Sequence, residues 1–345
     1  MRALTLFSLL LAPGVAALAH AQQAPAAGAT ANAIGVAFDS IRMRPLAGAR
    51  VRVDTSELFG TTDASGRFHI EGIPPGSHVL RVQHPLIDTL GVALRSDAET
   101  FAAGQTKALE LATPSPEILV SILCSAAWRN RGPAALMGRV YEADSGRPAA
   151  GAKVSFVWYE LDITSNVRRA PRVREAVVGA DGTYRICGLP AELEGRAQVI
   201  KGGLTSGDIP LNFGQDILML RSMSIALPGA VAAAPGTGPD SAAPRAAPLG
   251  SARLSGRVVT KAGQPLAGAR VQIDGTSRVA TTRPTGEFVL DSLPSGTQTV
   301  SARLLGYAPV EQAVDLSSSE ASSVTLSMDV FVPVLETVRV SAQRE

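Results

Sequence analysis

The sequence predicts an all-β protein built from three tandem antiparallel β-sandwiches of the seven-stranded type. Two observations carry this prediction: one block of residues occurs three times, and short segments of alternating apolar and polar residues lie between turn signals. The 345-residue chain contains 33 Gly and 23 Pro, and aromatic residues make up 4% of it. Such a composition is typical of many short strands joined by tight turns.

The repeated block has the pattern Pro-x-x-Gly-Ala-x-Val and begins at Pro45, Pro148 and Pro265. Downstream of each copy comes a Gly-containing turn followed by an aromatic residue, and then a Leu-Pro or Ile-Pro pair. The three aromatic residues are Phe68, Tyr184 and Phe288. Because all the marks recur in the same order, the repeating unit is a whole domain.

The segments between the turns have the two-residue period of half-buried strands. Ala49, Val51 and Val53 fall on one face of such a strand, and Arg50 and Arg52 fall on the other. The Asp-x-Gly and Asp-Gly turns supply the backbone angles that hairpins need. No segment longer than about three turns has a helical period.

Composition predicts the domain boundaries. The expected parts are a signal peptide over residues 1–21, a disordered Ala-rich linker over 22–33, module 1 over 34–116, module 2 over 118–227, a Pro/Ala/Gly linker over 228–250, module 3 over 251–329 and a tail over 330–345. Modules 1 and 2 have no such linker between them, so we expect them to form one rigid unit tied by a disulfide between Cys124 and Cys187.

The N-terminus predicts export. Met1-Arg2 precedes an apolar run over residues 3–18, and Ala19-His20-Ala21 is a small-x-small cleavage pattern. The run is too short for a membrane-spanning helix, which makes a retained anchor the weaker alternative, and no later stretch is apolar for long enough to span a bilayer. We therefore expect a periplasmic, outer-membrane or cell-surface protein. Its formal net charge of +2, with both signs interspersed, gives no basis for nucleic-acid binding.

The two cysteines, Cys124 and Cys187, predict one disulfide in an exported chain. In the loop-entropy model a bridge over this separation adds about 4 kcal/mol of stability. Two buried free thiols are the alternative.

Four elements in series resemble the carboxypeptidase regulatory-like domain, a transthyretin-like sandwich of the carbohydrate-binding-like fold group. They are a Gly-x-Val strand, Pro-Leu-x-Gly-Ala-x-Val, Thr-x-x-x-Gly-x-Phe and Leu-Pro-x-Gly, and they are clearest in module 3. Module 1 also matches well. Module 2 departs from the pattern: Ala152 and Tyr184 are 32 residues apart, against 19 for Ala49 and Phe68. Its extra residues, about 161–175, predict a lengthened hairpin.

The tail over residues 335–342 resembles the TonB box that follows this domain in TonB-dependent outer-membrane receptors, although Arg339 stands where an apolar residue is usual. The resemblance implies a partner-binding segment that adds as a strand to TonB or an equivalent protein. Its residues are Glu336, Thr337, Val338, Arg339 and Val340. The alternative is that residues 331–340 form the closing strand of module 3 or are disordered.

The sequence predicts no catalytic residue, no metal site and no cofactor. The His-x-x-Glu pair of zinc peptidases is absent, and the three histidines that follow the signal peptide, His69, His78 and His84, all lie in module 1. No Gly-x-Ser-x-Gly elbow occurs.

The lengthened hairpin holds the candidate ligand-binding residues. Alternation places Trp158 in the core with Val154 and Phe156, which leaves Tyr159 as an exposed stacking surface. Arg168 and Arg169, together with Arg172 and Arg174, are candidates for holding a carboxylate or phosphate, and a solvated loop is the alternative.

These observations predict a non-enzymatic exported binding or scaffold protein that recognises a protein or glycan partner through its sandwich modules. The second hypothesis makes the chain an accessory of an outer-membrane TonB-dependent transport system. In that case module 3 and the tail dock on TonB or on an outer-membrane receptor.

Overall fold

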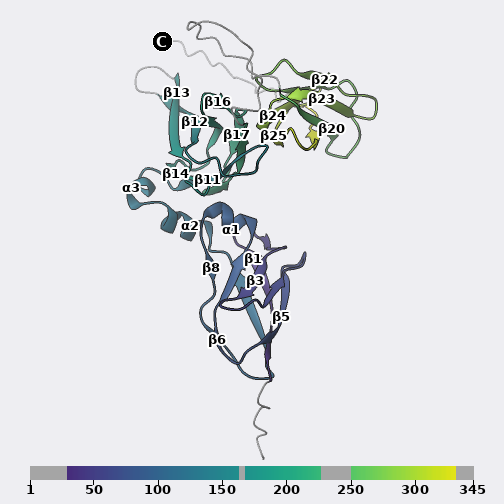
Figure 1. The fold of residues 1–345 in the computed structure, drawn as a ribbon. Helices are drawn as coiled ribbons and strands as arrows, with labels where there is room; N and C mark the ends of the chain where they lie inside the picture. Colours follow the sequence, from purple (N-terminus) through teal and green to yellow (C-terminus); the bar gives the residue numbers. More distant parts are fainter. Residues whose placement is uncertain (1–28, 163–167, 227–249, 332–345) are drawn as a thin grey trace, which may run out of the picture.

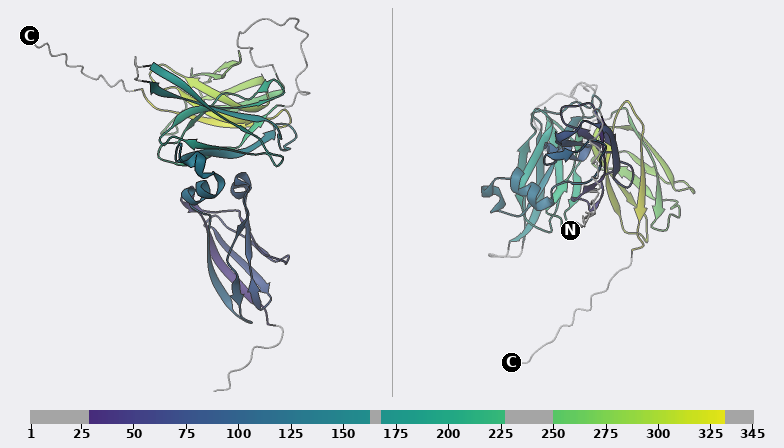
Figure 2. Two further views of the ribbon diagram at one scale, coloured as in Figure 1. Left: turned by 90° about the vertical axis from the view of Figure 1, so that its left-hand side faces the viewer. Right: turned by 90° about the horizontal axis from the view of Figure 1, so that it is seen from below.

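A computed structural model describes residues 29–162, 168–226 and 250–331, and it is an all-β protein as predicted (Figure 1). Module 1 extends away from modules 2 and 3, which lie side by side, and three short helices lie at the junction between modules 1 and 2 (Figures 1 and 2). The expected signal peptide over 1–21, the tail residues 336–340 and nearly all of the linker over 228–250 lie outside the described residues. No helix in the described ranges is long and apolar enough to cross a bilayer.

Module 1 is a sandwich of two main sheets with a small third one. Its elements are β1 (Ala31–Asp39), β2 (Arg44–Pro45), β3 (Arg50–Val53), β4 (Phe59–Thr61), β5 (Arg67–Ile73), β6 (Gly76–His78), β7 (Leu80–Gln83), α1 (Pro85–Leu90), β8 (Leu94–Arg95), β9 (Glu99–Phe101) and β10 (Thr106–Ala112). Strand β1 lies between β5 and β10, and the order β4-β3-β7-β8 forms the opposing sheet.

Module 2 begins with two helices and has longer strands than module 1. Its elements are α2 (Pro116–Leu123), α3 (Ala126–Arg129), β11 (Ala134–Glu142), β12 (Lys153–Asp162), β13 (Arg168–Val177), β14 (Thr183–Leu189), β15 (Glu194–Lys201), β16 (Leu204–Thr205), β17 (Ile209–Asn212), β18 (Leu218–Leu220) and β19 (Met223–Ile225). One sheet has the order β13-β12-β15-β16, and β14-β11 with β18 and β19 forms the other.

Module 3 repeats the plan of module 1. Its strands are β20 (Ala252–Thr260), β21 (Arg270–Ile273), β22 (Val279–Thr281), β23 (Glu287–Leu293), β24 (Gly296–Arg303), β25 (Val310–Leu316) and β26 (Ser322–Met328). Strand β20 lies between β23 and β26, and β24 pairs with β21 and β25 in the opposing sheet.

Each sandwich is closed by a parallel pairing of its first strand with a late strand, within an otherwise antiparallel arrangement. In each module the first strand has a glycine where it pairs with the late strand. At Gly35 an added Cβ would overlap the Leu109 carbonyl oxygen of the parallel strand and lie 2.7 Å from the Phe68 ring. The equivalent trios are Gly138 with Arg221 and Tyr184, and Gly256 with Val324 and Phe288. The aromatic ring therefore packs where only a glycine leaves room.

A buried threonine ties the second repeated block to the core. The Thr62 hydroxyl donates to the Leu46 carbonyl (2.6 Å) and accepts from the Ala49 N–H (2.7 Å). Thr282 makes the same two bonds in module 3, at 2.6 and 2.9 Å. Module 2 has Val178 at this position and keeps only the backbone bonds. Module 2 has thus diverged beside its long hairpin.

The three helices are absent from the sequence-based expectation, and the expected boundary at residues 116–118 falls inside α2. They have at most eight residues each, too few for a helical period to show. Ser115 caps α2 by accepting from the Ile118 N–H. The helices enclose a small apolar core between modules 1 and 2, formed by Leu90, Leu119, Val120, Cys124, Ala135, Met137 and Leu218.

Modules 2 and 3 are joined by a hydrogen-bonded sheet and by polar contacts. Strand β19 pairs with β11 and, at Ile225, with Gly296 of β24. The Thr299 hydroxyl donates to the Asp208 carbonyl (2.9 Å), and Arg196 pairs with Glu311 at 2.6 Å. Strand β24 is buried along seven of its eight residues, because module 2 covers the side that faces away from the core of module 3.

Asp144 of module 2 holds a turn of module 3. Its carboxylate accepts from the backbone N–H (2.8 Å) and the hydroxyl (2.7 Å) of Ser318, and it lies within hydrogen-bond distance of Ser295 and Ser317. Burial raises the pKa of Asp144, but these hydrogen bonds outweigh burial and leave the pKa below its ordinary value.

We predict that Gly138→Ala destabilises module 2 by about 3 kcal/mol or more, because the new methyl group would overlap the Arg221 carbonyl and the Tyr184 ring. Both tryptophans of the chain, Trp128 and Trp158, lie in module 2, so urea unfolding followed by tryptophan fluorescence measures its stability. The control is Gly146→Ala, at a left-handed glycine with no atom within 4 Å of the added Cβ. It should cost only about 1 kcal/mol. Equal losses in the two variants would contradict the role given to Gly138.

We also predict that acidification undocks module 3 from module 2. A carboxyl whose pKa is lowered in the folded state stabilises that state above the unfolded pKa, and this stabilisation is lost as the pH falls through the folded pKa. Small-angle X-ray scattering should show a larger maximum dimension at acidic pH. Asp144→Asn should give the extended form already at neutral pH. The matched control is Asp63→Asn, which removes a turn-capping carboxylate of module 1. An unchanged dimension for Asp144→Asn at every pH would refute the prediction.

Candidate functional site

An open groove of about 630 Å³ lies on one side of module 2. Strand β13, at residues 174–177, and strand β14, at residues 183–187, contribute two of its sides. The segment that joins α2 to α3 contributes the third, with Leu123, Cys124, Ser125 and Trp128. The groove is therefore built from segments that precede and follow, in the chain, the repeated block that begins at Pro148.

Two of these elements have no counterpart in modules 1 and 3. Strands β12 and β13 pair over ten residues each, from Lys153 with Val177 to Asp162 with Arg168, whereas β4 and β22 have three residues each. Strand β15 accompanies β12 only as far as Trp158, so the far end of the hairpin extends beyond the sheet. The lengthened hairpin agrees with the sequence-based prediction. The second element is the pair of helices that precedes β11.

Both strands that border the groove are sheet edges. Strand β13 is the last strand in the order β13-β12-β15-β16, and β14 is the last in β14-β11-β19. An edge strand has backbone N–H and C=O groups along one side that no neighbouring strand pairs, which makes it a template for another extended chain.

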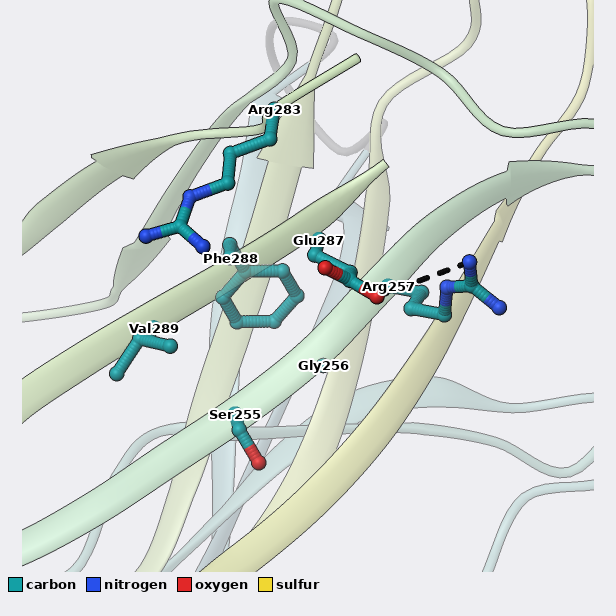
Figure 3. Close-up of a pocket in the computed structure, with 7 residues that line it drawn as sticks. All are labelled: Ser255, Gly256, Arg257, Arg283, Glu287, Phe288 and Val289. Carbon is teal, nitrogen blue, oxygen red and sulfur yellow. Dashed lines mark ion pairs between the residues drawn. The ribbon is translucent and has the colours of Figure 1, made fainter. Parts of the chain in front are cut away.

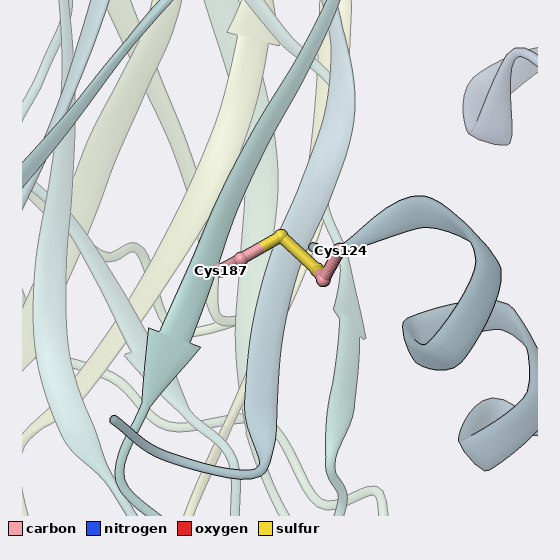
Figure 4. The surroundings of a disulfide bond; sticks show 2 residues. All are labelled: Cys124 and Cys187. Carbon is pink, nitrogen blue, oxygen red and sulfur yellow. A yellow bond between two sulfur atoms is a disulfide. The ribbon is translucent and has the colours of Figure 1, made fainter. Parts of the chain in front are cut away.

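The disulfide between Cys124 and Cys187 fixes the helical wall to the β14 floor (Figure 4). Its two Cα atoms are 5.9 Å apart, within the range that a disulfide bridges without moving the backbone. Cys124 follows the last residue of α2. The bridge therefore lies within the part of the chain from α2 to β14. The expectation that it ties module 1 to module 2 is therefore wrong, because both cysteines belong to module 2.

Trp128, which is 39% exposed, is the main aromatic side chain of the groove. The guanidinium of Arg131 lies 4.5 Å from the centre of its ring and that of Arg174 lies 5.7 Å away. Arg174 also lies 5.9 Å from the ring of Trp158, which is buried in the core as predicted. Arg174 thus connects α3 to the hairpin. The sequence analysis missed Trp128, although a tryptophan four residues after a cysteine in a short apolar segment was a usable signal.

The groove is positively charged. Arg131, Arg174 and Arg185 have no carboxylate within ion-pair distance in the described part of the chain. Arg185 donates to the Leu90 carbonyl (3.3 Å), and the Nε of Arg174 is buried without an acceptor. Glu175, the acidic residue on the lining, is paired with Lys153 at 3.1 Å. Two guanidinium groups, those of Arg174 and Arg185, therefore line the groove and can meet an anionic ligand, and Arg131 lies beside it on the Trp128 ring.

Two titratable groups near the groove are structural. Hydrogen bonds from Arg172 and Trp158 hold the pKa of Glu160 below its ordinary value. Burial raises the pKa of Tyr184 far above its ordinary value, and its hydroxyl donates to the Arg221 carbonyl at 2.7 Å. Glu160 therefore stays ionised and Tyr184 stays neutral at physiological pH.

The predicted ligand-binding residues divide between the two faces of the hairpin. Tyr159 is 64% exposed and faces outward, and so does Arg169, which pairs with Leu161. Arg168 pairs with Asp162 on the opposite face, because adjacent residues of a strand point to opposite sides. None of the three lines the groove. Exposed Leu161 and Val173 share the outer face with Tyr159.

A smaller hollow of about 280 Å³ lies on the outer face of β20 and β23 in module 3 (Figure 3). Gly256 and Phe288 line it, and Arg257 at its rim faces Glu287 at 3.7 Å. Arg283 is its second cation. Because Glu287 offsets the charge of Arg257, this hollow is less suited to an anion than the groove of module 2.

Within residues 29–162, 168–226 and 250–331, no cluster of three His, Cys, Asp or Glu side chains has the arrangement of a metal site. The predictions that the protein has no catalytic residue, metal or cofactor stay predictions.

No curated protein matches this chain. Three solved structures with weak overall similarity are the TIE protein of Bacillus anthracis (12% identity, TM-score 0.23, covering 87% of this chain and 50% of that one), a streptococcal ancillary pilin (11%, 0.19, 86% and 99%) and BcpA, the major pilin subunit of Bacillus cereus (10%, 0.20, 87% and 99%). The chain thus spans about half the length of the B. anthracis protein. Residues 253–329, the body of module 3, match the sequence profile of the carboxypeptidase regulatory-like domain.

Proposed function

We propose that this chain is an exported, non-enzymatic scaffold that binds a partner protein at the groove of module 2. The profile match of module 3 and the all-β architecture support a binding role. The sheet shared by modules 2 and 3, together with the apolar core at the α1–α2 junction, supports a rigid array. The N-terminal sequence supports export to the periplasm or cell surface.

The proposed mechanism is strand addition. The single observation that carries it is the pair of unpaired strand edges, β13 and β14, that border one groove beside Trp128. An extended segment of the partner hydrogen-bonds to the β14 edge, and its side chains alternate between the hairpin side and the helix side. Trp128 supplies the large, partly exposed ring that anchors binding surfaces of this kind.

We further propose a domain type for modules 1 and 2 and a second binding surface on the hairpin. We assign modules 1 and 2 to the same domain type as module 3, because the glycine and aromatic pair and the parallel closure recur in all three. The outer face of the hairpin, with Tyr159, Arg169 and Leu161, is the surface for a glycan or a second protein contact.

A second candidate function rests on the TonB-box-like sequence at residues 335–342. In this case the chain docks through module 3 and the tail on a TonB-dependent transport system. Residues 336–340 of the tail would add as a strand to TonB.

We predict that Trp128→Ala weakens binding of a groove ligand about tenfold or more, while Tyr159→Ala changes it less than about twofold. The ligands are peptides selected on the mature chain from a random display library, and a glycan array is probed in parallel. Biolayer interferometry gives the affinities. Hydrogen exchange should show that a bound peptide protects the β14 amides. If only Tyr159→Ala lost binding, or if the chain bound glycans and no peptide, the binding site would be the outer face of the hairpin and not the groove.

The tail hypothesis has its own test. The mature chain should retain the periplasmic domain of TonB in a pull-down, and a chain without residues 336–342 should not. A chain with the same seven residues in scrambled order is the control. Equal recovery with all three chains would eliminate the transport role.

A further inference from the structure

The charge of the groove identifies the kind of segment that fits it. We infer that the strand that adds to the β14 edge is acidic. This inference rests on the proposed strand addition and goes beyond it, because a strand edge by itself accepts any extended chain, whereas side-chain charge selects among chains.

The cations lie on both sides of the edge. Arg174 projects from the inner face of β13, since it pairs with the core residue Phe156. Arg185 projects from the outer face of β14, next to the α1 end, where its Nη2 reaches the Leu90 carbonyl. Alternate side chains of an added strand point to opposite faces of the sheet. Acidic residues at either the odd or the even positions of that strand would therefore meet a guanidinium. The third cation, Arg131, stacks on Trp128 at the helical wall.

The partly buried surroundings of Arg174 would strengthen its contact with a carboxylate. The Arg174 guanidinium lies between two indole rings, and its buried Nε has no acceptor in the described part of the chain. A carboxylate that bound the accessible part of this half-buried guanidinium would make a charge-assisted bond beside two rings that limit competition from water. The nearby carboxylates have partners of their own: Glu175 pairs with Lys153, and Asp181 accepts from the N–H and hydroxyl of Thr183. Glu160, whose charge also acts on Arg174, pairs with Arg172 at 2.8 Å.

The same charges disfavour self-association at this site. Strand β13 contains Arg168, Arg169, Arg172 and Arg174 against one acidic residue, Glu175. Antiparallel pairing of two β13 edges would bring arginines of both copies together, and Pro171 interrupts the row of backbone donors. A second copy of the chain is therefore a poor occupant, and an acidic strand is a good one.

The length of the free edge sets the size of the segment. The lining includes Thr183 to Cys187 of β14. At about 3.3 Å per residue, this edge accommodates a segment of roughly five residues. Beyond it, Trp128 covers Gly188, where an added Cβ would lie 2.6 Å from the Trp128 carbonyl oxygen.

The test compares three synthetic peptides on the full mature chain. They are the blocked heptapeptide Val-Glu-Val-Glu-Val-Glu-Val and its Gln and Lys counterparts, and fluorescence anisotropy of the labelled peptides gives the affinities. We expect the acidic peptide to bind at least about tenfold more tightly than the neutral one. Its affinity should fall as salt is raised from about 0.05 M to about 0.5 M.

Arg174→Gln and Arg185→Gln should each reduce binding of the acidic peptide about tenfold and leave the neutral peptide within about twofold. Arg174→Lys keeps the charge and should retain part of the affinity. It tests whether the loss of binding in Arg174→Gln comes only from the lost contacts with the Trp128 and Trp158 rings. Arg253→Gln, at an exposed arginine of module 3, is the matched control. Circular dichroism verifies that each variant is folded.

The outcomes separate the two proposals. Equal binding of acidic and neutral peptides, with no effect of the arginine variants, overturns the acidic preference and leaves strand addition standing. Binding of none of the three peptides, together with no peptide recovered from the display library, overturns both. Tighter binding of the Lys peptide overturns the charge argument directly.

Discussion

Every module is closed by the parallel pairing of its first strand with a late strand. A glycine in the first strand, covered by an aromatic ring, makes this closure possible. Gly35, Gly138 and Gly256 each lie where a backbone carbonyl and an aromatic ring leave no space for a Cβ. The carbonyl belongs to the parallel strand in modules 1 and 3 and to Arg221, between β18 and β19, in module 2. The ring belongs to the strand that follows the Asp-Gly-type turn, so one contact connects the start, middle and end of each module. The hydrophobic core fills the space that this closure encloses.

The three closed sandwiches are joined in two different ways. Modules 1 and 2 meet through an apolar core to which α1 and α2 contribute Leu90, Leu119 and Val120. Modules 2 and 3 meet through hydroxyl groups, an ion pair and the carboxylate of Asp144, so this interface depends on charge. Polar interfaces between domains resemble those of transient complexes, whereas buried apolar contacts resemble a domain interior. The joint between modules 1 and 2 is therefore mainly apolar, and the joint between modules 2 and 3 is more polar.

The candidate site arises where module 2 departs from the shared plan. The long β12–β13 hairpin and the helical segment before β11 flank the β14 edge, and a groove lies beside it. The disulfide holds the helical wall, and Arg174 links Trp128 to Trp158 across the two sides. Function on a repeated scaffold generally resides in such insertions, because the shared core residues are occupied with packing.

Four features could be predicted from the sequence: the all-β class, the burial of Trp158, the exposure of Tyr159 and the lengthened hairpin. These features depend on turn chemistry and on a two-residue period, both of which are local in the chain. It did not reveal α1, α2 and α3, because helices of four to eight residues are too short to show a period.

Only the tertiary structure brought Trp128, Arg174 and Arg185 together. They come from a helix, a hairpin strand and a sheet edge that are far apart in the chain, and no local pattern encodes their proximity. Likewise the register of β13 with β12 decides which face of the hairpin Arg168 occupies and which face Arg169 occupies. Side-chain periodicity determines what each strand buries. The packing of the α2–α3 segment beside the β14 edge decides which backbone groups and side chains of module 2 remain accessible to a partner.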